Sequence, residues 1–339
     1  MAWRVAVAGA NTAAGREVLR ALAESALPLG EVIGLGTGRS AGQEVGFGDA
    51  RTLRLRALDG FDFAGTDVAI LALGAAEARA AGPRASAAGA YVLDLSAAHR
   101  MEPGVPLVVP GVNLAALGRF KRRRMAALPA PAAAFAALAL QPLRELAPVT
   151  RLVALVLEPT SGAGKEGMDE LFTQTRASFV NDLPSPQQFP KPIAFNVIPQ
   201  VGAFGEDGQT EEEAGLGLAL RKVLDPDLVV GASAVRVPVF LGTSLALHVA
   251  FAEPLGVAEA RAALGRAPGL AVFDRREEGG YATPLDVAGE GVATVSRLRR
   301  DPGAEHGLAL WVVGDDLRWR GGAVVGVLEA LAREGLVGG

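Results

Sequence analysis

Short apolar runs alternate with stretches of helical spacing over the first third of the chain. Residues 4–8 form a compact apolar run, a glycine-containing turn follows from Gly9 to Gly15, and residues 16–22 place apolar side chains at helical spacing. Further apolar runs occur at 31–35, 68–73, 91–95 and 107–109, with an alanine-rich helical stretch at 75–88. This alternation predicts an α/β fold with a parallel sheet that carries helices on both faces.

The pattern changes near residue 128, where a second domain is predicted to begin. Longer β-prone runs follow at 152–157, 229–240 and 246–252, with a polar insertion near 181–192. These runs indicate an α+β domain. A strand at 308–313 and a last helix ending at Leu336 are predicted to return to the first domain. Two domains also suit a chain of 339 residues.

Composition and charge narrow the classes of function. Half of the residues are hydrophobic and 21% are charged, which is typical of a globular protein rather than a disordered or fibrous one. The net charge of −4 gives no basic field that would attract a phosphate backbone, so no nucleic-acid partner is expected. The basic cluster at 121–124 is short and is predicted to be a solvated loop.

The chain contains no cysteine. This absence excludes disulfides, zinc–thiolate sites, iron–sulfur clusters and every thiol nucleophile. The three histidines, His99, His248 and His306, lie far apart in sequence, so no metal site is predicted. His248 falls within an apolar run and is predicted to be a hydrogen-bonded core or interface residue.

The first residues of the chain and its longest uncharged stretch indicate where in the cell the protein is expected. The first residues run directly into an apolar strand, without a basic segment followed by a long apolar one, which predicts a cytoplasmic protein. The stretch 125–143 contains Pro129, Pro131 and Pro142 and is rich in alanine. It is therefore predicted to be a buried segment rather than a membrane span, and no membrane partner is expected.

The turn after the first strand carries candidate cofactor-binding residues. Gly9, Asn11, Thr12 and Gly15 lie in this turn between a strand and a helix. Such a turn can present backbone N–H groups to a pyrophosphate, although Thr12 occupies the place of the usual middle glycine. The alternative is a tight packing turn without a ligand.

The end of the second predicted strand bears on the choice of cofactor. Arg39 and Ser40 stand where dinucleotide-binding folds usually carry an acidic residue for the ribose hydroxyls of NAD. An arginine and a serine suit a 2′-phosphate instead, so NADP is predicted if a nicotinamide cofactor binds. The alternative is a solvated loop arginine.

Seven segments spread over nearly the whole chain share one resemblance. They are Gly9-Ala10 with Gly15, residues 39–42, 99–113, 161–165 with Glu170-Leu171, 193–200, 236–240 and 308–313. Together and in this order they resemble the aspartate-semialdehyde dehydrogenase family, and in particular its Usg-type paralogues that lack the catalytic cysteine.

The resemblance implies a fold, an assembly and a reaction. It implies a Rossmann-type NADP-binding domain over residues 1–127 and 314–339, and an α+β substrate and dimerisation domain over residues 128–313. A homodimer is implied, with residues 161–176 and the strand around Val237 as interface candidates. The family reaction belongs to amino-acid biosynthesis: a thiolate attacks the aldehyde, hydride passes to NADP, and phosphate displaces the thioester.

Four positions of the family's active site carry different residues in this chain. The resemblance places the nucleophilic cysteine on Pro131, the catalytic histidine on Thr243, the aldehyde-positioning glutamine on Glu158 and the acidic residue for the substrate amino group on Ala219. Residues 128–137 contain no other nucleophile. Thr243 cannot shuttle a proton near neutral pH. The chain is therefore predicted to lack the family's activity.

Three basic residues remain at positions where the family contacts anions. Arg100 and Lys222 correspond to phosphate- or substrate-contacting positions, and Arg236 to the arginine that clamps the substrate carboxylate. They predict a small anionic metabolite as ligand. The alternative is that they form ion pairs with Glu158 or its neighbours. Asparagines of the family's cofactor side fall on Asp316 and Val324, so retention and loss of NADP both remain open.

Three functions follow from this combination. The first is a non-catalytic member that keeps the fold and the dimer. The second is an NADP-dependent reductase that transfers hydride without a covalent intermediate, with Glu158 as its acid. The third is a metabolite sensor or an interaction scaffold.

Overall fold

The chain divides into two compact units. The computed structural model describes residues 2–49, 51–180, 184–335 and 337. The first unit comprises residues 1–130 and 320–339, and the second comprises residues 131–319. The divisions fall a few residues after the predicted boundaries at 127 and 313. In the part of the chain that the structure describes, no helix is long and apolar enough to cross a membrane.

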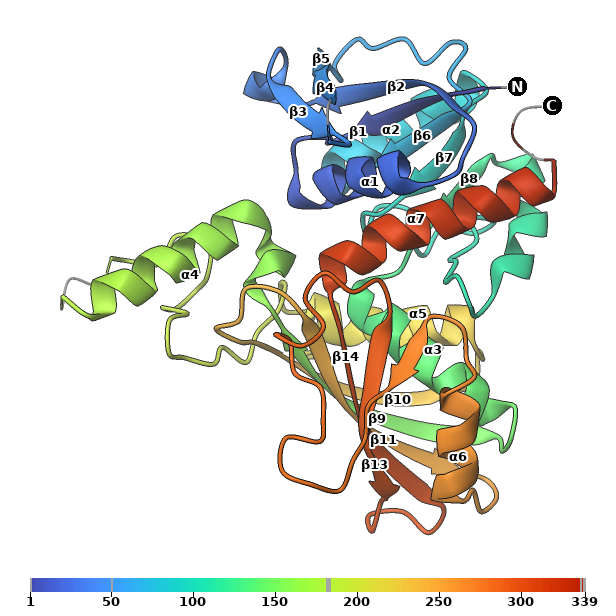
Figure 1. The fold of residues 1–339 in the computed structure, drawn as a ribbon, viewed down its shortest axis with the longest axis vertical. Coiled ribbons are helices and arrows are strands. Elements are labelled where there is room, and N and C mark those ends of the chain that lie inside the picture. The colour runs from blue at the N-terminus through green and yellow to red at the C-terminus, as the bar shows by residue number, and fades with distance from the viewer. Residues whose placement is uncertain (1, 50, 181–183, 336, 338–339) are drawn as a thin grey trace. The chain divides into compact units, whose positions relative to one another are not determined.

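The first unit is built on a parallel sheet with strand order β5-β2-β1-β6-β7-β8 (Figure 1). The strands are β1 (Trp3–Ala8), β2 (Leu29–Gly36), β5 (Arg56–Ala57), β6 (Val68–Leu71), β7 (Tyr91–Asp94) and β8 (Met125–Ala127). Strands of a parallel sheet are covered on both faces and therefore read as continuous apolar runs. Accordingly, all four residues of β6 are buried.

Helices and one hairpin complete the first unit. Helix α1 (Ala13–Glu24) follows β1 and buries Val18, Leu19 and Leu22, whose spacing places them on one face. Helix α2 (Ala75–Ala87) connects β6 to β7. Strands β3 (Glu44–Phe47) and β4 (Arg51–Arg54) form an antiparallel pair, and residues Leu114–Arg122 form 3-10 turns before β8.

The second unit is built on a mixed sheet with strand order β10-β9-β11-β14-β13-β12. The strands are β9 (Val149–Glu158), β10 (Val229–Arg236), β11 (Thr243–Phe251), β12 (Leu270–Val272), β13 (Ala293–Arg300) and β14 (Gly307–Gly314). Strand β10 runs parallel to β9, whereas β11 is antiparallel to both β9 and β14.

Three helices form a layer on one face of this sheet. Helix α3 (Pro131–Arg144) packs against β9, β11 and β14, and it also contacts α5 (Glu211–Val223) and α6 (Val257–Leu264). The opposite face of β9 leaves Val153 and Leu155 exposed. Helix α4 (Gly164–Ser178) extends away from the sheet of its own unit (Figure 1).

Helix α3 accounts for most of the long uncharged stretch in the sequence. Twelve of its 14 residues are buried, and seven residues from Ala132 to Leu138 are all buried without a break. Alanine-rich faces allow a helix to approach its neighbours closely on every side. The predicted buried segment therefore includes the central helix of the second unit.

Two predicted strand assignments differ from the structure. Residues 107–109 are buried, but they contribute only an isolated bridge from Leu107 to Ala127, and β8 takes the outer place in the sheet. The predicted strand at 308–313 corresponds to β14, which lies in the sheet of the second unit, in agreement with the domain limits that the resemblance implies and not with the return to the first domain that the pattern alone indicated. The return is made by helix α7 (Asp316–Arg333), which belongs to the first unit from Arg320 onward.

Candidate functional site

The glycine turn after β1 brings four predicted cofactor-binding residues together. Gly9 has φ +79°, and a Cβ there would lie 2.1 Å from the carbonyl oxygen of Ala72. A Cβ at Gly15 would lie 2.0 Å from the carbonyl oxygen of Gly9. Both glycines are thus required by the close approach of backbone segments, whether or not a ligand binds.

Thr12 and Asn11 determine what this turn offers to a ligand. The Thr12 hydroxyl caps α1: it accepts the Gly15 N–H at 3.0 Å and donates to the Gly9 carbonyl at 2.8 Å. One N–H group of the first helical turn is therefore already bonded within the protein. The Asn11 Oδ1 atom is buried without a hydrogen-bond partner. The strand–turn–helix arrangement fits a dinucleotide, but at least one of its backbone N–H groups is already hydrogen-bonded to Thr12. Dinucleotide binding at this turn stays a prediction.

Ser40 points inward from the end of β2. It is buried, and its hydroxyl donates to the Thr37 carbonyl at 2.6 Å. The hydroxyl also lies against Gly36, where a Cβ would be 2.4 Å from Ser40 Oγ. To contact a 2′-phosphate, Ser40 would have to give up its bond to Thr37. The side chain of Arg39 lies outside the described residues.

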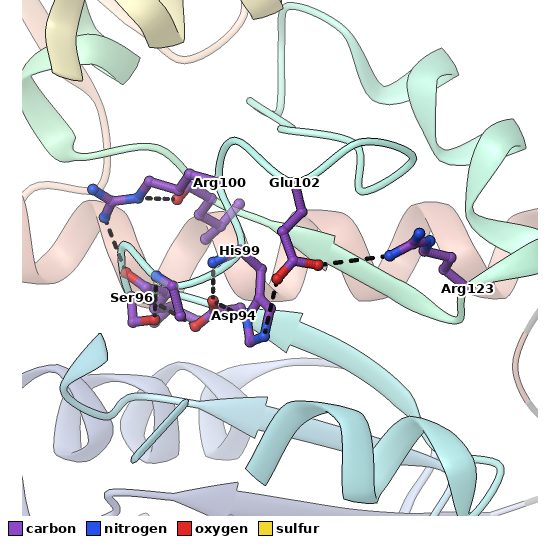
Figure 2. A network of polar contacts seen from close by, with 9 residues as sticks. Asp94, Ser96, His99, Arg100, Glu102 and Arg123 are labelled. Carbon is purple, nitrogen blue, oxygen red and sulfur yellow. Dashed lines mark hydrogen bonds and ion pairs between the residues drawn. The ribbon is translucent and has the colours of Figure 1, made fainter. Parts of the chain in front are cut away.

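A buried aspartate–histidine pair lies at the end of β7 (Figure 2). The Asp94 carboxylate accepts the Ser96 N–H at 2.8 Å and the His99 N–H at 3.3 Å, and it lies 2.7 Å from His99 Nδ1. Both side chains of the pair are almost inaccessible, at 0% and 1% exposure. His99 Nε2 lies 3.9 Å from Glu102, whose other oxygen is 3.6 Å from Arg123. These contacts fix the loop that carries Arg100.

Arg100 is held at the carboxyl end of the parallel strands. Its Nε donates to the Leu128 carbonyl at 2.9 Å, and Nη2 donates to the Leu95 carbonyl at 3.1 Å (Figure 2). Ligands of open parallel sheets bind outside this edge. Arg100 is therefore placed at the appropriate edge, although part of its guanidinium is bonded to the protein itself.

The second unit brings Arg236 together with Glu158. The two residues are register partners at the ends of β10 and β9. Arg236 Nη1 lies 3.8 Å from Glu158 Oε2, and their side chains are 10% and 9% exposed. Arg236 also donates to the Pro159 carbonyl at 2.5 Å and lies 5.8 Å from the centre of the Phe189 ring. The ion pair with Glu158, one of the two interpretations of Arg236, is thus present, and anion binding at Arg236 stays a prediction.

The position predicted for the catalytic histidine is fully buried. Thr243 is 0% exposed at the start of β11, and its Oγ1 has no hydrogen-bond partner. It pairs with Gly314 on β14, and a Cβ on Gly314 would lie 2.7 Å from the ring of Phe135. The face shared by Thr243 and Gly314 is therefore packed against helix α3, and a threonine there offers no proton shuttle.

The acidic residues Asp315 and Asp316 at the start of α7 bind backbone and side-chain donors from several loops. The Asp316 carboxylate accepts the Gly242 N–H at 3.0 Å and the Ser161 hydroxyl at 2.9 Å. Asp315 accepts the Gly289 N–H at 2.8 Å and caps the start of the helix through the Leu317 N–H at 3.0 Å. Both carboxylates are buried. Asp316 anchors the loop that precedes Thr243, and Asp315 anchors the loop at Gly289. Neither residue stood out in the sequence as a structural residue.

The remaining predicted positions are distributed over two helices of the second unit. Pro131 is the first residue of α3, where a missing N–H causes no loss because helix-initiating N–H groups have no intrahelical partner. Ala219 and Lys222 lie on α5, with Ala219 buried and Lys222 half-buried in the last turn. No group of three or more metal-binding side chains occurs among the residues that were described.

His248 is hydrogen-bonded and its side chain is 45% exposed, so it is not a core residue, and an interface position stays a prediction. Its Nδ1 lies 2.8 Å from Asp301 Oδ2. Burial raises the pKa of the Asp301 carboxyl, but the Gly303 N–H, the hydrogen bond and charge of His248 and the charge of Arg299 outweigh this effect. The net result is a pKa below the usual value of an aspartate.

A dinucleotide-type parallel sheet precedes a mixed-sheet domain in this chain, and both parts match the semialdehyde dehydrogenases. Residues 4–119 match the family described as semialdehyde dehydrogenase, NAD binding domain. Residues 140–319 match semialdehyde dehydrogenase, dimerisation domain. The chain belongs to the semialdehyde dehydrogenase family, which confirms the resemblance to that family and the predicted fold class. The narrower resemblance to Usg-type paralogues stays a prediction.

Relatives of the chain include proteins named aspartate-semialdehyde dehydrogenase. The protein from Rickettsia bellii is 34% identical over 316 residues, covering 93% of each chain. The protein from Aquifex aeolicus is 35% identical over 342 residues, covering 99% of this chain and 100% of its own. The crystal structure of aspartate semialdehyde dehydrogenase II from Vibrio cholerae, complexed with ASA, has a TM-score of 0.95 at 31% identity and covers 98% and 99% of the two chains.

Proposed function

We propose that this chain is a semialdehyde dehydrogenase family member that does not catalyse the phosphorylating oxidation of aspartate semialdehyde. The observation that carries the proposal is the complete absence of cysteine from the sequence. Oxidation coupled to phosphate transfer needs a thioester on the enzyme, and no other residue type forms one. The position assigned to the nucleophile is Pro131, whose ring has no nucleophilic atom.

The position assigned to the catalytic base supports the same proposal. Thr243 is fully buried and carries a hydroxyl that does not titrate near neutral pH. Glu158, the candidate acid of the reductase alternative, faces Arg236 at 3.8 Å. No specific observation favours that alternative over a protein without the family's chemistry.

The activity assay is direct. Purified protein is mixed with aspartate semialdehyde, phosphate and NADP, and NADPH absorbance is followed, with the Aquifex aeolicus enzyme as positive control. The expected rate equals the rate without protein. Phosphate-dependent formation of NADPH well above that rate would refute the proposal.

We further propose a cytoplasmic homodimer in which the dinucleotide fold retains a preference for NADP. The match to a dimerisation domain supports the assembly, and an equilibrium sedimentation mass near the monomer value of 34.7 kDa would contradict it. The match to an NAD binding domain supports a nucleotide. Calorimetric titration with NADP and with NAD tests the preference, and absence of binding would mean that the turn at Thr12 no longer accepts the cofactor.

A further inference from the structure

Arg236 and Glu158 form an ion pair in which the arginine is a potential carboxylate-binding group and the glutamate supplies the carboxylate. A guanidinium with free N–H groups at a strand end is suited to bind a carboxylate. In this chain the adjacent strand end supplies a carboxylate 3.8 Å from Arg236 Nη1. The register that pairs Arg236 with Glu158 directs both side chains to the same face of the sheet, so the encounter is built into the strand pairing.

The residues around the ion pair of Arg236 and Glu158 cover it and separate it from solvent. The 3-10 turn Thr160–Ala163 lies directly over it, because a Cβ at Gly162 would be 2.7 Å from Arg236 Nη1 and 3.1 Å from Glu158 Oε2. The buried ring of Phe189 stacks on the guanidinium. Phe189 is itself held in a small apolar cluster with Leu171, Ile193 and Ile198.

The segment that presents Phe189 is fastened to helix α4 by two side chains. Glu170 Oε2 accepts the N–H groups of Gln187 at 3.0 Å and Gln188 at 2.5 Å. Gln174 Oε1, on a fully buried side chain, accepts the Ile193 N–H at 2.7 Å. The cover of the ion pair is therefore a fixed part of the fold.

From these contacts we infer that Arg236 is a carboxylate-binding site that the chain fills with its own Glu158. A second carboxylate brought to Arg236 would enter a buried position beside a like charge, which is strongly unfavourable at low dielectric. Glu158 therefore determines specificity: it excludes ligands that would present a carboxylate at this point, the substrate of the related dehydrogenases included. The inference does not depend on the loss of activity in the proposed function, because it concerns binding at Arg236 and not turnover.

Removal of the internal carboxylate should create a site for an external one. The variant Glu158→Ala leaves a space about the size of acetate next to an uncompensated arginine. We expect it to unfold several degrees below the wild type in sodium chloride. Acetate at the same ionic strength should recover at least about half of that loss in a saturable way, as expected for a ligand that binds only the folded state.

Three controls separate this effect from a general effect of salt or volume. Acetamide, which has the same shape without the charge, should give no recovery. The wild type should not respond to acetate. The double variant Glu158→Ala/Arg236→Met should not respond either. Equal recovery with acetamide, or acetate recovery in the double variant, would overturn the inference.

If Glu158→Ala does not fold in chloride, its refolding yield provides the same test. A yield that is several-fold higher in acetate than in acetamide supports the inference, and equal yields refute it. Because the readout is binding and not turnover, the result is independent of the NADPH assay. Phosphate-dependent NADPH formation by this chain would refute the proposed function, but it would not change the outcome of the acetate test.

Discussion

Gly314 allows helix α3 to pack against the sheet of the second unit. An added Cβ would lie 2.7, 2.9 and 3.1 Å from three carbon atoms of the Phe135 ring. That ring is 0% exposed and contacts Trp319 edge to face, with 5.7 Å between ring centres. It has no open space to move into. We therefore expect Gly314→Ala to destabilise the unit through overpacking, by about 2 kcal/mol within the usual range of about 1–3.

The size of the effect can be checked with a double-mutant cycle. Phe135→Ala alone should cost about 3–5 kcal/mol because it opens a cavity. In that background the Cβ of Gly314→Ala meets no ring, so its additional cost should fall below about 0.5 kcal/mol. Gly231→Ala, at a strand glycine with nothing within 4 Å of an added Cβ, is the matched control and should change stability by less than about 0.5 kcal/mol.

Urea unfolding measured by fluorescence and circular dichroism provides the free energies. Trp311 and Trp319 belong to the second unit, and a Trp3→Phe background removes the tryptophan of the first. A loss of 2 kcal/mol corresponds to a drop of about 4–8 °C in the melting temperature of a unit of this size. Additive costs of the two substitutions would refute the proposed steric contact.

Four further substitutions test three sets of polar contacts. Thr210→Ala removes a side-chain cap and its capping box from α5 and should cost about 1 kcal/mol in urea unfolding. The pKa of Asp301 is lowered in the folded state, so its ionised carboxylate stabilises the fold above the unfolded-state pKa of 3.8, and this stabilisation is lost as pH falls through the folded-state pKa. Asp301→Asn should therefore reduce the loss of unfolding free energy at acid pH. His248→Gln should reduce it in part. Asp94→Ala leaves the buried His99 ring without its 2.7 Å partner and should cost at least about 2 kcal/mol, measured by thermal unfolding of the first unit.

The α/β architecture could be predicted because the apolar runs mark the strands and the helical spacing of apolar residues marks the helices. In β1 and β6, apolar runs coincide with strands that are buried on both faces, and the spacing of Val18 and Leu22 identifies α1. The strand predicted at residues 107–109 was wrong because a buried apolar run does not need to pair as a strand. Pro106 and Pro110 flank this run and have no N–H group to donate to a neighbouring strand.

The candidate site was only partly accessible to sequence reasoning. An ion pair between Arg236 and Glu158 was one of two interpretations, and only the strand register shows that the two side chains meet. The Asp94–His99 pair and the loop-anchoring role of Asp316 were missed, because both depend on partners brought together by the fold. A histidine five residues after the last residue of a buried strand is a weak signal that could have indicated the first of them.

Pro131 at the start of α3 also has a genetic consequence. Proline and cysteine codons differ at more than one base, and so do threonine and histidine codons. Placing a thiol and an imidazole at these two positions, which the proposed function takes as those of the nucleophile and the base, would therefore require at least two base changes in each codon. Meanwhile a proline at the first position suits the helix that it begins. The residue that begins α3 favourably is thus also one that no single base change converts to cysteine.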